Sequence, residues 1–209
     1  MKKLFPLFIL LFFFGKNTFA QDTISLKNAS FEWGSAVANS IPIGWQICSR
    51  PTETPPDVHT EKSRHYGVQH SPMKGDKFLG MVVRSNFTYE SIHQKLKMPL
   101  QENKTYKMHL YVAMSKTFKS HDAKTMNEEF FTQPAIIRIW GVENACETKE
   151  LLFESEVIDH ENWKRIAFEF TPKMAHQRIM FEAFYDKMVA DPYNGNVLLD
   201  GISDIIEVE

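Results

Sequence analysis

The sequence is poor in cysteine, with two residues, and in glycine, with nine, and it has no cluster of basic residues. It also has no long hydrophobic run after its N-terminal segment. A membrane-spanning helix in the rest of the chain is thereby excluded, because such a helix needs about 20 consecutive apolar residues. The lack of a basic cluster argues against nucleic acid or an anionic membrane as a partner. The motifs of serine hydrolases, zinc proteases and phosphate-binding loops are missing too, so we expect a protein that is not an enzyme.

Residues 1–20 have the pattern of a signal peptide. Two lysines near the start precede the uncharged apolar stretch 4–15, and small residues lead to a cleavage site after Ala20. No cysteine follows this site, so we expect no lipid anchor. We therefore predict that the remaining residues, 21–209, are exported as a soluble chain with no transmembrane segment, to the periplasm or to the cell surface and beyond.

The exported part corresponds in length to a single domain, since domains commonly hold about 100–200 residues. It contains no repeat, low-complexity tract or linker that would separate a second domain. Without the three lysines of the leader, 21 basic residues stand against 26 acidic ones, a net charge of −5. A weak negative charge of this kind again gives no reason to expect nucleic acid.

Alternating hydrophobic and polar residues predict β-strands along most of the chain. The strand-like runs are 77–84, 90–98, 104–114, 135–142, 163–172, 177–185 and 196–208. Helical periodicity is poor, and only 121–131 has the composition for a turn or two of helix. Many short strands without intervening helices favour an all-β fold, an antiparallel β-sandwich or barrel.

Several short motifs occur in an order that resembles the CenC-type carbohydrate-binding modules, which are jelly rolls of the galactose-binding-like superfamily. The motifs are Asn28-x-x-Phe31-Glu32, Pro42-x-Gly44-Trp45, Gly75-Asp76-x-Phe78-Leu79, "IHQKLKMPLQENKTYKMHLYV", Trp163 and "NGNVLLDGI". The resemblance spans nearly all of 21–209. It implies a single jelly-roll domain that binds a polysaccharide or glycoconjugate, or a surface that carries glycans, without catalysis.

A second set of motifs resembles a branch of secreted and outer-membrane proteins of Bacteroidetes. The motifs are "ETPPDV", "LGMVVR", "RIWG", "ACETKELL" and "PYNGNVLLD". This likeness informs location more than ligand.

The resemblance also implies a structural calcium ion. In the family, the Glu after Phe and the Asp of the last strand hold the ion together with a loop before an early strand. The matching residues are Glu32, Asp200 and Asp76, and their oxygens are the ligands that calcium prefers. The last strand reads "LLDGI", where the family often has a second acid. The alternative is that Glu32 and Asp200 are ordinary polar residues at strand ends.

The two cysteines, Cys48 and Cys146, are predicted to form one disulfide. Export to an oxidising compartment and an even cysteine count favour pairing, and the Bacteroidetes branch also has a cysteine at both positions. Two buried free thiols remain the alternative, because sequence spacing does not prove a bond.

A ligand-binding face is predicted from the strand 135–142. Alternation places Arg138 and Trp140 on one face of it. Tyr111 and His109 would join them if their strand belongs to the same sheet, and Arg84 and Glu182 could join as well. Sugars are bound by such faces, where rings stack on aromatic planes and charged groups hydrogen-bond hydroxyls. In the alternative, Trp140 is a core residue and Arg138 lies at an edge.

Other aromatic and histidine residues receive plainer interpretations. Trp45 is predicted to pack in the core rather than to stack on a sugar, with Gly44 allowing the turn before it. His59, His65 and His70 match no zinc-ligand spacing, so we expect a solvated loop.

Two other functions remain open. The chain can be a protein-docking accessory subunit of an outer-membrane secretion, adhesion or gliding-motility complex, a role favoured by Phe118, Phe130 and Phe131 in a long connection. It can also be a glycosidase, which requires two acids facing each other across a groove. The pairs Glu128–Glu129 and Glu53–Asp57 are the acids available for that reaction.

Overall fold

The computed structural model describes residues 22–48, 54–63, 65–121, 127–144, 146 and 149–208. The signal peptide predicted at 1–20 lies outside these residues. Within the described ranges, none of the helical segments has the length and apolar character needed to cross a bilayer.

The described residues form antiparallel strands and one short 3-10 turn, η1 (His65–Gly67). The strands are β1 (Thr23–Ile24), β2 (Gln46–Ile47), β3 (Asp57–His59), β4 (Phe78–Val83), β5 (Ser91–Leu100), β6 (Thr105–Ala113), β7 (Lys119–His121), β8 (Glu128–Phe130), β9 (Ile136–Val142), β10 (Lys149–Glu154), β11 (Lys164–Phe170), β12 (His176–Phe184), β13 (Gly195–Asp200) and β14 (Ile205–Val208).

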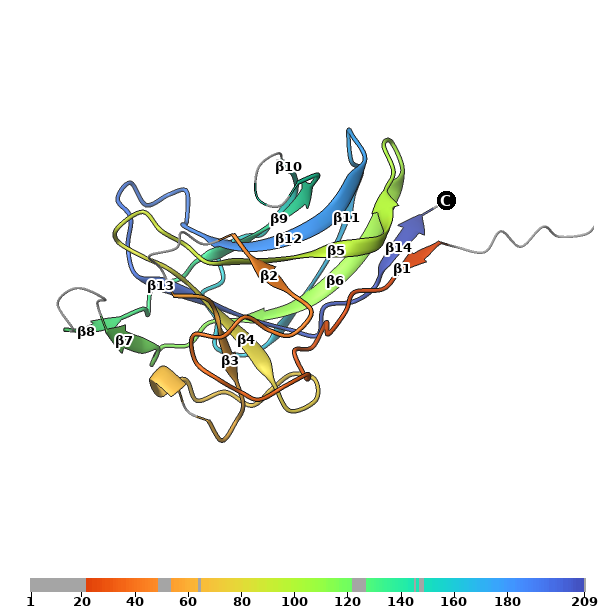
Figure 1. Cartoon of the computed structure of the whole chain (residues 1–209). Helices are drawn as coiled ribbons and strands as arrows, with labels where there is room; N and C mark the ends of the chain where they lie inside the picture. The colour runs from red at the N-terminus through yellow and green to blue at the C-terminus, as the bar shows by residue number, and fades with distance from the viewer. Residues whose placement is uncertain are drawn as a thin grey trace, which may run out of the picture.

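Two curved sheets lie face to face and form a β-sandwich (Figure 1). The five-stranded sheet has the order β10-β9-β12-β5-β2. The seven-stranded sheet has the order β1-β14-β6-β13-β4-β3, and β11 pairs with the free side of β6. The short β7–β8 hairpin projects at one end of the sandwich, while β1 and β14 lie side by side at the other. The predicted all-β antiparallel sandwich is thus confirmed.

The core fills the space between the sheets, and strand alternation supplies it. In β6, Met108, Leu110 and Val112 are buried, whereas the residues between them face outward. In β9, Ile137 and Ile139 are completely buried in the same cluster. Each sheet therefore has one apolar face toward the core and one mixed face on the outside.

The long predicted strands agree with β4, β5, β6, β9, β11 and β12. The run 196–208 instead forms two strands, β13 and β14, because the chain bends at Gly201, where φ is 54°. The strands of two or three residues were not predicted, because so short a stretch shows no clear alternation of polar and apolar residues. The described part of 121–131 contains β8 and no helix.

Residues 28–45, which precede β2, are held together by hydrogen bonds from Asn28 and by aromatic packing. Asn28 donates from its side chain to the Ile43 carbonyl (2.8 Å), and its own carbonyl accepts the indole N–H of Trp45 (3.1 Å). Trp45 and Phe31 are buried against each other, with ring centroids 6.0 Å apart. Gly44 has φ of 91°, a left-handed conformation that suits glycine in the turn before Trp45. The prediction that Trp45 packs in the core is confirmed.

A smaller apolar cluster lies outside the main core, beside the β7–β8 hairpin. Phe118 and Phe131 are buried in it, whereas Phe130 is 59% exposed. Two of the three phenylalanines that favoured a docking loop are therefore core residues.

The expectation of a solvated histidine loop is wrong at His59. This side chain is fully buried and stacks on Phe78 with ring centroids 5.3 Å apart. Burial lowers the pKa of His59 to about 3, so the ring is neutral.

Candidate functional site

The outer face of the five-stranded sheet brings together three predicted site residues. Cross-strand pairing places Arg138 opposite Glu182 on one side and opposite Glu154 on the other. Residues paired in this way project from the same side of the sheet. The aromatic face, as we call this surface, consists of Arg138, Trp140, Glu154, Glu182 and Phe184.

Arg138 is held in a fixed position by its neighbours. Its Nε donates to Glu154 Oε2 (2.8 Å), and its guanidinium lies 3.5 Å from the centroid of the Phe184 ring. Glu154 also pairs with Lys187. Partial burial raises the pKa of Glu154, but hydrogen bonds from Lys187 and Arg138 outweigh it, so the net shift is downward. The carboxylate is therefore ionised and presents an acceptor at the surface.

Trp140 is half-buried, which falls between the two predicted possibilities of a free surface ring and a core residue. Its indole N–H donates to Glu182 Oε1 (3.0 Å). Leu151 and Met180 flank it in register on the neighbouring strands. Trp140 is thus partly exposed beside Arg138, while its polar edge is already engaged.

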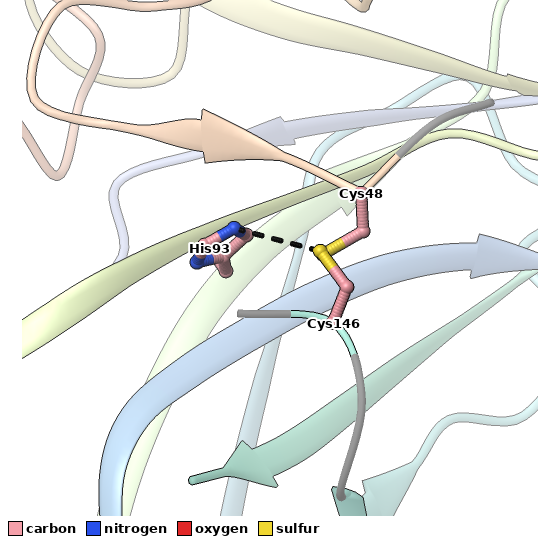
Figure 2. A group of neighbouring side chains, drawn as sticks. All are labelled: Cys48, His93 and Cys146. Carbon is pink, nitrogen blue, oxygen red and sulfur yellow. Dashed lines mark hydrogen bonds between the residues drawn. A yellow bond between two sulfur atoms is a disulfide. The ribbon is translucent and has the colours of Figure 1, made fainter. Parts of the chain in front are cut away.

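Glu182 is only 2% exposed although it lies on an outer face. Beside it, His93 and Met180 are also buried. A disulfide crosses this part of the sheet, joining Cys48 after β2 to Cys146 in the β9–β10 connection (Figure 2). The predicted bond is confirmed, with Cα atoms 5.5 Å apart and a sequence separation of 98.

Cys48, His93 and Cys146 are residue types that bind metals, and their donor atoms lie within 4.8 Å of one another. In the bonded form, however, the sulfurs are occupied by each other. His93 Nε2 lies 3.9 Å from Cys146 Sγ, and Nδ1 lies 3.4 Å from Arg178 Nη1. Because the guanidinium can only donate, Nδ1 is the acceptor and Nε2 carries the proton. That tautomer disfavours a metal at Nε2, so the group acts as a cross-link over the sheet.

Arg84 does not join the aromatic face. It follows β4 of the other sheet and forms an ion pair with Glu90, whose side chain is 2% exposed. Asp57 lies close enough to influence the same carboxyl group. Burial raises the pKa of Glu90 to about 8 and that of Asp57 to about 7, although Arg84 opposes both shifts. Because the two buried acids have one cation beside them, each makes ionisation of the other less favourable.

Tyr111 also lies elsewhere, because β6 belongs to the seven-stranded sheet. It projects from the outer face of that sheet, next to His109, with ring centroids 6.0 Å apart. The hypothesis that Tyr111 and His109 share a face with Arg138 is therefore wrong. Alternation along one strand gives the direction of a side chain but not the sheet to which the strand belongs.

The residues predicted to hold calcium converge on the loop 73–77, as expected. Glu32 accepts hydrogen bonds from the backbone N–H groups of Asp76 and Lys77 (3.1–3.2 Å). Asp200 accepts from Met73 and Lys74 (2.8 Å each).

This arrangement fits a cation poorly. The carboxylate oxygens of Glu32 and Asp200 are already occupied by N–H donors, whereas calcium needs several oxygens aimed at one point. The Asp76 residue is exposed. Burial raises the pKa of Asp200 to about 6 despite its three backbone N–H donors. The two acids act here as a clamp on the loop, and the calcium site stays a prediction.

The sequence did not single out Glu154 and Phe184 of the aromatic face, or Leu151, which flanks Trp140. Leu151 and Glu154 lie on β10, which sequence alternation did not reveal because a bulge between Leu151 and Phe153 breaks the pattern. Phe184 lay inside a predicted strand, two residues after Glu182, and that spacing was a usable signal.

Solved structures of low sequence identity share this fold. The chain is similar to a cyclase from Fischerella sp. TAU (TM-score 0.55, 14% identity, covering 90% of this chain and 98% of the cyclase). It is similar to the CBM22-1 xylan-binding domain of Paenibacillus barcinonensis Xyn10C (0.51, 17%, 91% and 97%). It is also similar to the K2 cleaved adhesin domain of Lys-gingipain (0.52, 11%, 91% and 98%).

At these identities the likeness shows the fold alone, and it confirms the jelly-roll sandwich. No curated protein matches the chain in sequence. The profile of one family, CBM_4_9_1, described as BppA domain 1, matches residues 84–203. That segment is more than half of the 209 residues and contains β5, β6, β9 and β12, which build the centres of both sheets. The chain belongs to the CBM_4_9_1 family, a family of carbohydrate-binding-module domains.

Proposed function

We propose that this protein is an exported, non-catalytic domain that binds a glycan, or a surface bearing glycans, through the aromatic face. The observation that carries the proposal is the fixed group of Arg138 over Phe184, beside Trp140 and its partner Glu182. A sugar ring needs an apolar plane for its C–H faces and oriented polar groups for its hydroxyls. This group supplies both within one pair of strands.

Two comparisons support the proposal. The family profile is that of a carbohydrate-binding module, and a similar structure, the CBM22-1 domain, is named as xylan-binding. The cyclases share the fold at comparable identity, and their activity is not carried over because fold alone does not give function. We propose no catalytic residues for this chain.

Export is part of the same proposal. The leader pattern at 1–20 supports it, as does the choice of a disulfide for a long-range cross-link, since such bonds persist in oxidising compartments. The resemblance to CenC-type modules and to the Bacteroidetes branch supports a periplasmic or cell-surface location.

A second function, docking to an outer-membrane protein complex, is favoured by a different surface. Four exposed apolar residues lie in one N-terminal segment: Trp33 (52% exposed), Val37 (45%), Ile41 (43%) and Ile43 (55%). The side chain of Ile43 reaches to Gly34, next to Trp33. Exposed apolar groups that gather in this way are typical of interaction sites.

The two functions are separated by two tryptophan substitutions. A glycan array is probed with the wild type, Trp140→Ala and Trp33→Ala. Loss of the aromatic face should lower the array signal by about tenfold or more, which corresponds to about 1.4 kcal/mol of binding free energy. Trp33→Ala is the matched control, because it removes the same side chain from the other surface and should leave the signal unchanged.

An unchanged signal in Trp140→Ala, with the fold intact by circular dichroism, would contradict the glycan proposal. If Trp33→Ala alone lowered binding, the site would have to be moved to the N-terminal apolar segment. A wild type that binds no glycan on a broad array would leave the docking function as the better account.

A further inference from the structure

The outer face of the seven-stranded sheet has a hollow of about 490 Å³, on the opposite side of the sandwich from the aromatic face. It lies over β6, β11 and β14 and the turn that joins β13 to β14. Its polar lining includes Lys107, His109, Arg165, Glu169 and Asp204. A volume between about 300 and 1,000 Å³ is usual for small-ligand sites.

The hollow exists because small residues lie on both sides of His109. Ala167 is its cross-strand neighbour on β11. On the other side, Ser203 accepts the backbone N–H of His109 (2.8 Å) and donates its own N–H to the His109 carbonyl (2.8 Å). The turn is therefore fixed against β6 without a large side chain to fill the space.

Longer side chains form the two sides of the hollow. One wall is the row Ile206, Lys107 and Glu169, paired in register across β14, β6 and β11. The other wall is Arg165, and its cross-strand neighbour Tyr111 lies next to the hollow without lining it. The rings of Tyr111 and His109 are nearly perpendicular, at 85°, and form an aromatic corner.

The hollow is positive on the side of Arg165. Within the described ranges, the Arg165 guanidinium has no hydrogen-bond or ion-pair partner. Burial lowers the pKa of His109, and the nearby charges of Arg165 and Lys74 lower it further. The imidazole is therefore neutral at pH 7 and available to stack or to exchange a hydrogen bond.

We propose that this hollow is a second binding site, for a sugar unit that carries a carboxylate, that is, a uronic acid residue of a glycan. Arg165 binds the carboxylate, since a guanidinium matches its two oxygens. His109, beside Tyr111, contacts the ring, and the carboxylates of Asp204 and Glu169 accept its hydroxyls. The site shares no residue with the aromatic face, so one molecule can bind two glycan segments on opposite sides.

The test is a calorimetric or NMR titration with glucuronic acid, glucose and inorganic sulfate as probes. Wild type should bind glucuronic acid at least tenfold more tightly than glucose or sulfate. Arg165→Gln should remove that preference. Lys97→Gln, which removes a cation from an exposed position of β5 in the other sheet, is the control and should leave it intact.

Trp140→Ala distinguishes this site from the proposed function. Glucuronic acid binding that survives in Trp140→Ala and fails in Arg165→Gln supports the second site. Binding that fails only in Trp140→Ala would overturn it and place the acid sugar on the aromatic face. Sulfate that binds as tightly as glucuronic acid, or glucuronic acid that does not bind at millimolar concentration, would also overturn it.

Discussion

The two outer faces of the sandwich are built by the same strand alternation but differ in what covers them. On the five-stranded sheet, large side chains are already paired with one another, and the Cys48–Cys146 bond crosses the strands beside them. On the seven-stranded sheet, small residues leave a hollow, and Arg165 has no partner among the described residues. Alternation decides which residues face outward, whereas long-range cross-links and the size of neighbours decide which of them stay accessible.

The difference has a consequence for binding. The aromatic face is preorganised, because Arg138 and Trp140 are held by Glu154, Phe184 and Glu182 before any ligand arrives. Preorganised groups lose little side-chain freedom on binding, which favours affinity. The hollow must order Arg165 when a ligand enters, so we expect weaker binding there.

The largest effect is expected from removing the Cys48–Cys146 disulfide, which crosses the sheet beside the aromatic face. The double substitution Cys48→Ser/Cys146→Ser opens a loop of 98 residues. In the chain-entropy model, a loop of this length makes the bond worth up to about 4–5 kcal/mol. Urea denaturation of the wild type and the variant measures the change in the free energy of unfolding.

The contrasting outcome for that variant is an unchanged denaturation midpoint, which would mean that the bond contributes nothing to the fold. Wild-type protein denatured in the presence of a reducing agent is the control, and it should behave like the double variant.

A change of pH is expected to affect stability with opposite signs through two acids, the buried Glu90 and Glu154 of the aromatic face. Glu90, beside Arg84, has a folded-state pKa raised to about 8. A raised acid pKa stabilises the fold at low pH, and the stability is lost as pH rises from the unfolded value of about 4.3 through 8. Between pH 5 and 9, we expect the free energy of unfolding to fall less in Glu90→Gln than in the wild type, by on the order of a few kcal/mol.

Glu154 on the aromatic face has a lowered pKa. Its contribution is therefore present above the unfolded value and lost as pH falls through the folded one. Glu154→Gln should flatten the acid side of the stability curve below about pH 4.3, by a small amount because the group is partly solvated. Chemical denaturation across pH compares both variants. A Glu90→Gln curve parallel to the wild type between pH 5 and 9 would contradict the buried acid pair.

The Trp140→Ala variant allows both stability and glycan binding to be measured on one protein. A buried tryptophan replaced by alanine costs about 3–5 kcal/mol. Because Trp140 is half-buried and loses one hydrogen bond, we expect about 1–3 kcal/mol for Trp140→Ala. Thermal melting checks this value, with Trp33→Ala as the control that should cost less than about 0.5 kcal/mol. A loss of 4 kcal/mol or more would make Trp140 a core residue.

The smallest effect concerns the loop clamp formed by Glu32 and Asp200. If N–H donors satisfy both carboxylates, chelator-treated protein should melt at the same temperature with and without millimolar calcium. Glu32→Gln should lower the stability by about 1–2 kcal/mol, because charge-assisted hydrogen bonds are weakened. A calcium-dependent rise in melting temperature, absent from Glu32→Gln, would instead establish the calcium site predicted from the family resemblance.

The sequence predicted the fold class well because the relevant signal is local. The alternation in β6 and β9 can be read within seven to nine residues, and both strands formed as predicted. The disulfide was predictable for a different reason: the chain has only two cysteines, and its leader pattern predicted export to an oxidising compartment, where such a pair is favoured.

The candidate site was predicted in part, because its assembly depends on long-range pairing. Arg138, Trp140 and Glu182 meet because β9 and β12 are neighbours, whereas Tyr111 lies in the other sheet. No periodicity within a strand contains that information. The burial of Glu182 and of His59 was equally hidden, because their neighbours lie far away in sequence, such as Trp140 beside Glu182 and Phe118 beside His59.

The most direct test of the central claim is to map a bound glycan by NMR. Amide chemical shifts of the wild type are followed as the best glycan from the array is added. The account predicts the largest changes in β9, β10 and β12, around Arg138, Glu154 and Glu182. Changes confined to 33–43, or spread evenly over the molecule, would contradict the assignment of glycan binding to the aromatic face.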